Sequence, residues 1–375
     1  MSTSSDRTVL VVGGTGLVGS AAVSEFLARG WTVATLSRRT PEAPGRRPLR
    51  ALVADLRDRD GVARALRELP VVTHLVYAAL HETPELMSGW TEREQQETNL
   101  AMFANVVDPV AARGALEHVS LLQGAKAYGA HLHPIRVPSR EREPRDDHPN
   151  FYWLQEDHLA MRRAEHGFGS TILRPQLIIG DATGVAMNPL IAIGMYLAIR
   201  ARLGEPAGFP GGACDVWQMT DAALLAESLA WAAETPAARN QTFNVTNGDE
   251  FHWRDLWPAV VEMAGARQGP DDPTSVRDYL LDHRAVWAEM VREHGLVDEP
   301  METVLAQSAI YADHCMGYGR SDSAYPRLLS TIAIRQAGFA ACRDTEDSVR
   351  YWLERLVSRR RLPRPRGVGA AAPGR

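Results

Sequence analysis

The sequence predicts an α/β protein, with a doubly wound parallel sheet followed by a mostly helical C-terminal portion. Short apolar, β-branched runs alternate with amphipathic segments through the first half of the chain. A glycine-rich turn follows the first of these runs. Beyond residue 180 most apolar residues instead recur at helical spacing. Continuous apolar strands separated by helices are typical of a parallel sheet that is covered on both faces.

These patterns place the expected elements. Strands are expected at residues 8–12, 32–37, 49–54, 74–79, 118–122 and 170–179. Helices are expected at residues 190–203, 220–234, 253–264, 276–294 and 345–357, with one strand-like run at 242–245. We therefore expect a sheet domain at residues 1–180 and a helical substrate-binding portion at 181–357 that returns in part to the sheet. The tail at 358–375, rich in arginine, proline and glycine, is expected to be disordered.

The bulk composition narrows the class of protein. With a formal net charge of −5, the chain has no basic excess for nucleic acid or an anionic membrane. Its three cysteines form no CxxC pair and its histidines show no metal-ligand spacing, so we expect no metal site. The longest apolar stretch, at residues 189–199, is shorter than the roughly 20 residues that cross a bilayer. We expect a cytoplasmic protein with no membrane or nucleic-acid partner, and we leave a homodimer open.

The glycine-rich turn reads Gly13-Gly14-Thr15-Gly16-Leu17-Val18-Gly19 and opens a helix. Gly13 can adopt the backbone angles of a tight turn, Gly16 lets the chain approach a pyrophosphate, and Gly19 lets the helix pack closely on the strand. The N–H groups at the start of the helix would then bind the phosphates. In this strand–turn–helix context the motif predicts a Rossmann-type dinucleotide site, and the alternative is a tight turn that binds no ligand.

The end of the second strand indicates which dinucleotide is bound. An NAD site usually has a carboxylate there, which holds the ribose hydroxyls. This chain has Ser37-Arg38-Arg39 instead. Guanidinium groups suit the 2′-phosphate of NADP(H), so we expect NADPH/NADP+, with a solvated arginine pair as the alternative. Asp55 and Leu56, after the third strand, are expected near the adenine ring, with a loop-capping role for Asp55 as the alternative.

Lys126 is the only lysine in the chain. Many reductases of this architecture use a tyrosine with a lysine four residues later, but Leu122 occupies that place here. Lys126 follows the fifth strand and Tyr152 begins the next helix, so both are expected at the carboxyl edge of the sheet, where ligands bind. We expect the Lys126 ammonium and the Tyr152 phenol to meet over the nicotinamide. The alternatives are a chance lysine on a solvated face and a tyrosine that only packs.

Further pieces of sequence accompany this pair. They are Ser37-Arg38-Arg39, Ser120-Leu121 with Gly124, Asn150-Phe151 with Glu156-Asp157, Arg174-Pro175, Asn188, 243–248 and Trp253. With them the chain resembles the progesterone 5β-reductase and iridoid synthase family of atypical extended short-chain dehydrogenases. The resemblance implies that Tyr152 and Lys126 are catalytic in NADPH-dependent 1,4-reduction of α,β-unsaturated carbonyls. The chain departs from the plant enzymes at Ala79-Leu80 and at Leu122, so steroid or iridoid substrates are not assumed.

The expected cofactor site draws on several further segments. Besides the glycine turn, residues 37–39 and residues 55–56, it is expected to include Ala79, Leu80, Tyr152, Pro175, Ile178 and Met187. In the expected mechanism, NADPH delivers hydride to the β-carbon of a small enone. Tyr152 stabilises the enolate oxygen, and Lys126 lowers the pKa of Tyr152. An aldehyde or ketone reductase that uses the same pair is the first alternative, and a non-catalytic NADP(H) sensor is the second.

Overall fold

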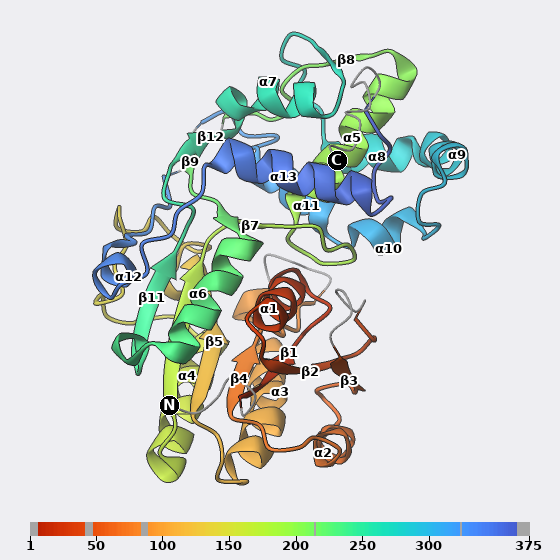
Figure 1. Ribbon diagram of the computed structural model, residues 1–375. Helices are drawn as coiled ribbons and strands as arrows, with labels where there is room; N and C mark the ends of the chain where they lie inside the picture. Colours follow the sequence, from red (N-terminus) through yellow and green to blue (C-terminus); the bar gives the residue numbers. More distant parts are fainter. Residues whose placement is uncertain (1–6, 42–47, 84–88, 214, 323–324, 366–375) are drawn as a thin grey trace, which may run out of the picture. The chain divides into compact units, whose positions relative to one another are not determined.

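The computed structural model describes residues 7–41, 48–83, 89–213, 215–322 and 325–365 (Figure 1). The chain divides into two compact units. Unit 1 comprises residues 1–178, 218–248 and 327–342, and unit 2 comprises residues 179–217, 249–326 and 343–375. The first crossing lies close to the boundary expected at residue 180, and the chain then returns to unit 1 twice.

Unit 1 is built on a seven-stranded sheet with the strand order β11-β6-β5-β4-β1-β2-β3. Its strands are β1 (Thr8–Val12), β2 (Thr32–Ser37), β3 (Leu49–Val53), β4 (His74–Tyr77), β5 (His118–Leu122), β6 (Gly169–Pro175) and β11 (Gln241–Val245). Every neighbouring pair is parallel. Because β1 pairs with β2 on one side and β4 on the other, the strand order reverses beside β1. Ligands of open α/β sheets bind at such a reversal, outside the carboxyl ends of the strands.

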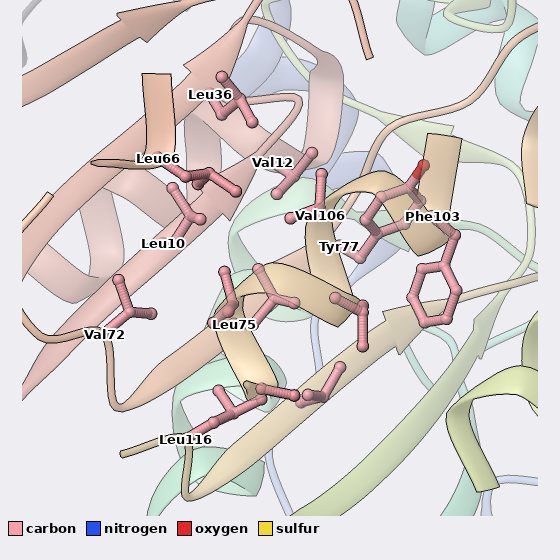
Figure 2. Packing of buried hydrophobic residues seen from close by; sticks show 14 of the residues in the cluster. Leu10, Val12, Leu36, Leu66, Val72, Leu75, Tyr77, Phe103, Val106 and Leu116 are labelled. Atoms are coloured by element: carbon pink, nitrogen blue, oxygen red, sulfur yellow. The ribbon is translucent and has the colours of Figure 1, made fainter. Parts of the chain in front are cut away.

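Helices cover both faces of this sheet. One core contains side chains of α2 (Arg59–Arg67), α3 (Arg93–Ala111) and α4 (Phe151–His166). The other contains side chains of α1 (Leu17–Ala28), α6 (Ala222–Glu234) and α12 (Ile332–Gln336). In Figure 2 the first core is seen from close by, with Tyr77 of β4 packed edge-on against Phe103 of α3. Burial on both faces explains why these strands read as continuous apolar runs.

The strand expected at residues 170–179 is two elements. β6 ends at Pro175, and β7 (Ile178–Ile179) begins after a turn in which Leu177 has a φ of 39°. A leucine at positive φ cannot continue a strand. Thr220 fixes the turn, because its hydroxyl accepts a hydrogen bond from the Gln176 N–H at 3.2 Å and donates one to the Gln176 carbonyl at 2.7 Å.

Unit 2 is mainly helical. Its helices are α5 (Pro189–Leu203), α7 (Trp253–Met263), α8 (Val276–Asp282), α9 (Arg284–His294), α10 (Met301–Leu305), α11 (Ser308–Cys315) and α13 (Thr345–Ser358). The helix expected at 276–294 is interrupted at His283, whose backbone leaves the helical region. Two short strand pairs complete the unit, namely β8 (Pro206–Ala207) with β13 (Arg267–Gln268) and β9 (Val216–Trp217) with β12 (Phe251–His252). Within the described ranges, no helix combines the length and apolar character needed to span a bilayer.

Disorder was expected from residue 358, but the structure describes the chain up to residue 365. Beyond the end of α13, Arg361 forms an ion pair with Glu299 at 3.1 Å, and Leu362 is buried against Gly194 of α5. Arg361 and Leu362 therefore pack within unit 2, because their side chains find partners that composition alone does not reveal. Residues 366–375 lie outside the described residues.

Candidate functional site

The glycine turn lies at the carboxyl end of β1, where the strand order reverses. Gly13 has a φ of 83°, and a Cβ there would come within 2.8 Å of the Ala78 carbonyl oxygen, so a side chain has neither the backbone angle nor the space it needs. The Gly13 N–H donates to the Leu36 carbonyl at 2.9 Å, which ties the turn to β2. A Cβ on Gly19 would collide with the Gly13 carbonyl. The tight turn and the close helix packing expected from the sequence are both present.

The start of α1 offers backbone N–H groups to an anion. Gly16 is the N-cap in an extended conformation, and no side chain caps the helix. The amides of Leu17 and Val18 have no acceptor within the helix, as in any first helical turn. Thr15 is half-buried beside them. A tight turn without side chains, followed by these amides and the positive end of the helix dipole, fits the pyrophosphate of a dinucleotide.

The end of β2 holds the arginine pair. The Ser37 hydroxyl is buried and has no hydrogen-bond partner in the part of the chain that the structure describes. Arg38 and Arg39 are exposed. Both guanidinium groups are therefore accessible to a phosphate, next to a buried hydroxyl whose hydrogen-bonding capacity is unused.

The carboxylate of Asp55 is paired with Arg57. Arg57 binds it through its backbone and side-chain nitrogens, with the closest approach at 2.6 Å. These hydrogen bonds lower the pKa of Asp55 to about 2. Arg57 thus adds a third guanidinium close to Arg38, which also lowers the pKa of Asp55. Leu56 is buried in the first core, and its expected place near the adenine ring stays a prediction.

The residues after β4 are small or exposed. Ala79 is half-buried against the first core, and the Leu80 side chain is 37% exposed. The next residue, His81, exchanges two hydrogen bonds of 2.9 Å with the Asn99 side chain through its backbone N–H and carbonyl. Asn99 of α3 therefore fixes the path of the chain at this edge of the sheet.

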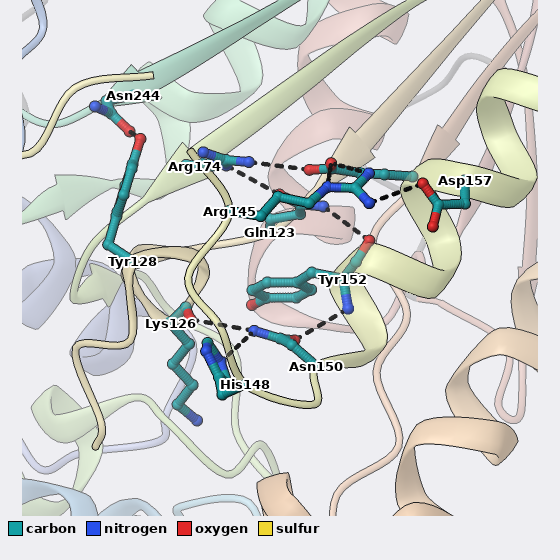
Figure 3. A network of polar contacts seen from close by, with 11 residues as sticks. Gln123, Lys126, Tyr128, Arg145, His148, Asn150, Tyr152, Asp157, Arg174 and Asn244 are labelled. Atoms are coloured by element: carbon teal, nitrogen blue, oxygen red, sulfur yellow. Dashed lines mark hydrogen bonds and ion pairs between the residues drawn. The ribbon is translucent and has the colours of Figure 1, made fainter. Parts of the chain in front are cut away.

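Asn150 links the segments that carry Lys126 and Tyr152 (Figure 3). Lys126 lies in the 3-10 turn η3 (Ala125–Tyr128) after β5, and Tyr152 lies in the first turn of α4. The Asn150 side chain accepts from the Tyr152 N–H at 3.0 Å and donates to the Lys126 carbonyl at 3.1 Å. Its amide also contacts His148 Nε2 at 3.1 Å, and His148 Nδ1 is 2.6 Å from Asp146. Two segments far apart in sequence are thus joined by one helix cap.

Lys126 and Tyr152 share the indole of Trp90. The Lys126 Nζ lies 3.5 Å from the centroid of the Trp90 ring, and the Tyr152 ring lies edge-on to it with centroids 5.4 Å apart. No hydrogen bond joins the two head groups in the described structure, and Figure 3 shows the Lys126 side chain extending away from the Tyr152 hydroxyl. That hydroxyl lies beside Gly124, where a Cβ would come within 3.5 Å of its oxygen.

The electrostatics of the pair differ from the expectation. Burial lowers the pKa of Lys126 to about 8, against the opposing charge of Glu82. Burial raises the pKa of Tyr152, and Glu82 raises it further while Arg174 opposes the change. The expectation that Lys126 lowers the tyrosine pKa is therefore wrong, because desolvation dominates and the ammonium faces Trp90 and Glu82. Tyr152 is a protonated phenol at neutral pH, which can donate a hydrogen bond.

A buried ion pair between Arg174 and Glu156 lies next to the segment that carries Tyr152. Arg174 of β6 donates to the Gln123 side chain at 3.0 Å and to Glu156 at 2.9 Å, and Gln123 Nε2 is 3.4 Å from the Tyr152 carbonyl. Arg145 also binds Glu156, at 2.8 Å. Glu156, beyond the first turn of α4, therefore fixes α4 against β6 beneath Tyr152.

Residues 9–245 match the model of the NAD dependent epimerase/dehydratase family, which spans more than half of the chain. The chain belongs to this family. The protein (S)-8-oxocitronellyl enol synthase ISY2 of Nepeta cataria is 30% identical, with 94% of this chain and 91% of that protein covered. The CYC2 enzyme of the same name from Camptotheca acuminata is 29% identical, with 94% and 93% covered. The resemblance to iridoid synthase-like enzymes is thereby confirmed, and the chain is an enzyme.

Solved structures of UDP-glucose 4-epimerases confirm the expected fold. A UDP-glucose 4-epimerase of Thermotoga maritima, with UDP-glucose, superposes with a TM-score of 0.67 at 15% identity, covering 94% of this chain and 99% of that chain. A UDP-glucose 4-epimerase of Thermus thermophilus, in complex with NAD, gives a TM-score of 0.60 at 21% identity, covering 93% and 98%. At these identities the likeness shows the extended Rossmann-type fold alone.

The remaining expected residues of this family member lie in different units. Pro175 ends β6, and Ile178 begins β7 after the Leu177 turn, both in unit 1. Met187 precedes α5 in unit 2, so its place in the cofactor site stays a prediction. Sequence reasoning missed Glu82, Trp90 and Arg57. Trp90 and Glu82 act on Lys126, which lies far from both along the chain, so the structure was needed to reveal them. Arg57 lies two residues after Asp55, and this short spacing was a signal that sequence reasoning overlooked.

Proposed function

We propose that this enzyme is an NADPH-dependent reductase of α,β-unsaturated carbonyls. The observation that carries the proposal is the buried, protonated Tyr152 phenol beside Gly124, with the ammonium of the only lysine on the same indole. A neutral phenol in a dry site is a hydrogen-bond donor for an oxygen that gains negative charge. A nearby ammonium further stabilises that charge.

The cofactor would be held by the segments at the carboxyl edge of the sheet. The turn from Gly13 to Gly19 and the amides of Leu17 and Val18 would bind the pyrophosphate. Arg38 and Arg39 would bind the 2′-phosphate, and the Ser37 hydroxyl would donate to the ribose or the phosphate. Because Ser37-Arg38-Arg39 at the end of β2 contains no carboxylate, we propose NADPH rather than NADH.

The protein groups act on the carbonyl oxygen of the substrate. When bound, NADPH supplies the hydride that adds to the β-carbon. As the carbon–carbon double bond shifts toward the carbonyl, negative charge develops on that oxygen, and the Tyr152 O–H donates a hydrogen bond to it. The raised pKa of Tyr152 keeps its proton in place until the enolate forms. Protonation of the enolate by Tyr152 or by solvent then completes an enol.

The names of the relatives support this reaction class. They are (S)-8-oxocitronellyl enol synthases, and an enol is the product when hydride adds at the β-carbon of an unsaturated aldehyde. We propose a small enal or enone as the substrate class. In this proposal the small Ala79 and the exposed Leu80 would shape the pocket beside the cofactor, so the substrate need not be that of the relatives.

An NADPH-oxidation screen with product identification tests the proposal. The panel would contain small enals, cyclic enones and the matching saturated aldehydes and ketones. We expect oxidation of NADPH with the unsaturated compounds and recovery of saturated carbonyl products. Allylic or saturated alcohols as the first products would instead identify a carbonyl reductase. Binding of NADPH without turnover on any compound would identify a non-catalytic cofactor sensor.

A further inference from the structure

Trp90 lies at the centre of an aromatic cluster that contacts Lys126 and Tyr152. Its side chain is buried, with 2% of its surface exposed. The indole contacts Tyr152, Phe151 and His131, with ring centroids 5.4, 4.7 and 5.9 Å apart. The face of the same ring carries the Lys126 Nζ at 3.5 Å from the centroid. A desolvated ammonium over an indole face is an energetically significant cation–π contact.

Glu82 completes the surroundings of the ammonium. The Trp90 Nε1–H donates to the Glu82 carboxylate at 3.3 Å. Burial raises the pKa of Glu82, and the charge of Lys126 opposes that change. In the same way Glu82 opposes the lowering of the Lys126 pKa by burial. The indole therefore presents its edge to the carboxylate and its face to the ammonium.

The other titratable groups that face Lys126 are neutral. His131 packs edge-on against Trp90, and burial lowers its pKa to about 4 with a contribution from Lys126, so it is uncharged at neutral pH. Asp146 lies behind it, bound to His133 and His148. Tyr152 keeps its proton. Among the described groups that face the ammonium, Glu82 is the one whose charge opposes the lowering of the Lys126 pKa.

We propose that Trp90 and Glu82 are positioning residues that hold the Lys126 ammonium in place and charged on the indole that Tyr152 also contacts, a role that rests on the reductase function proposed above. The indole fixes where the ammonium sits, and the carboxylate favours its protonated form. Without both, the buried amine would lose its proton near neutral pH, because burial favours the uncharged form. The field that stabilises the enolate would then be absent at the pH of turnover.

Because Lys126 is the only lysine in the chain, its protonation can be measured without turnover. Protein produced with 13C-labelled lysine contains a single lysine ε-carbon, whose chemical shift reports the protonation of Lys126. In the wild-type protein we expect the signal to titrate with an apparent pKa of about 8. In Glu82→Gln, which keeps the shape and removes the charge, the apparent pKa should fall by about one unit. In Trp90→Phe, which weakens the cation–π contact and removes the donor to Glu82, it should fall by a smaller amount.

Two matched variants serve as controls. Glu92→Gln removes an exposed carboxylate at the start of α3, and Trp153→Phe changes an indole that carries Arg145 instead of Lys126. Neither should move the lysine signal. An unchanged lysine titration in both Glu82→Gln and Trp90→Phe, with native thermal unfolding, would overturn the proposal, as would a wild-type lysine that titrates like a solvated amine.

The kinetic readout separates this proposal from the function on which it rests. With an active substrate, the alkaline limb of kcat/KM should move to lower pH in Glu82→Gln by the same amount as the lysine signal, and remain in place in Glu92→Gln. If the lysine signal shifts as expected but no enone is reduced, the proposed function fails while the holding contacts stand. If enones are reduced and the limb does not move, the positioning role fails while the function stands.

Discussion

Gly124 lies beside the hydroxyl of Tyr152, so that a Cβ on this glycine would be 3.5 Å from the phenolic oxygen and 3.3 Å from the Pro175 carbonyl oxygen. Its φ of 179° is extended backbone, which other residues also adopt. The glycine is therefore explained by the space that it leaves beside the phenol. In the proposed function, a substrate carbonyl oxygen would occupy that space to accept the Tyr152 hydrogen bond.

Gly124→Ala should reduce turnover without preventing folding. The added methyl group fits the backbone but occupies the space next to the Tyr152 oxygen, so the substrate oxygen is displaced from its donor. We expect kcat/KM for an unsaturated aldehyde to fall roughly 10-fold or more, because small misplacements at a reacting centre are costly. Steady-state kinetics together with NADPH titration by fluorescence check this, and unchanged kinetics would contradict it.

Tyr152→Phe should lose most of the activity. The variant removes a single hydrogen-bond donor from a dry site, which typically costs on the order of 100-fold in rate. Tyr128→Phe is the matched control, because the Tyr128 hydroxyl is buried too but binds Asn244 at 2.7 Å instead of facing the space beside Gly124. Comparison of kcat for both variants is the measurement. Equal losses would show that the effect is structural.

Lys126→Arg should also lose most of the turnover while the protein still binds NADPH. Arginine keeps the charge but replaces a compact ammonium by a planar fork of different reach, which does not fit the same place over Trp90. Single-turnover kinetics with saturating NADPH separate the chemical step from binding. Near-normal rates would remove Lys126 from the mechanism.

Cofactor preference should depend on the guanidinium groups near β2 and β3. Arg38→Ala is expected to raise the KM for NADPH about 10-fold or more and leave that for NADH little changed, since one charged hydrogen bond to the 2′-phosphate is worth about 1.5–3 kcal/mol. Arg57→Ala should act in the same direction, because it frees the charge of Asp55. Arg67→Ala, at an exposed position of α2, is the control. An equal effect on NADH would argue against a phosphate site.

Turnover should fall as the pH rises through about 8. Burial lowers the pKa of Lys126 from the ordinary lysine range to about 8, so the ammonium is charged below that pH and neutral above it. The pKa of Tyr152 is raised, so its phenol keeps its proton over the same range. The loss should therefore follow a single deprotonation, seen in kcat/KM measured from about pH 6 to about pH 10. A profile that stays flat to the alkaline end would contradict this assignment.

Much of unit 1 was predictable from the sequence. The strands were found because both faces are buried, which leaves runs such as Thr8–Val12 continuously apolar. The glycine turn was found because Gly13 and Gly19 are required by backbone angle and space. Leu177 was not found as a strand break, because positive φ at a leucine leaves no compositional signal.

The candidate site was only partly predictable. Asn150 joins the segments that carry Lys126 and Tyr152, while their meeting over the nicotinamide stays a prediction. The sign of the tyrosine pKa shift was wrong because it depends on burial and on where the ammonium points. Trp90 contacts both Lys126 and Tyr152, and Glu82 acts on the pKa of both, but the two residues lie on a connection after β4 that carries no recognisable motif.

The position of isotope transfer tests the reductase function most directly. The enzyme would be given C4-deuterated NADPH and a small unsaturated aldehyde, and the product would be examined by NMR. We expect deuterium on the β-carbon of a saturated aldehyde, with the transfer strongly reduced in Tyr152→Phe. Deuterium on the carbinol carbon of an alcohol would show direct carbonyl reduction and would contradict the proposed 1,4-reduction.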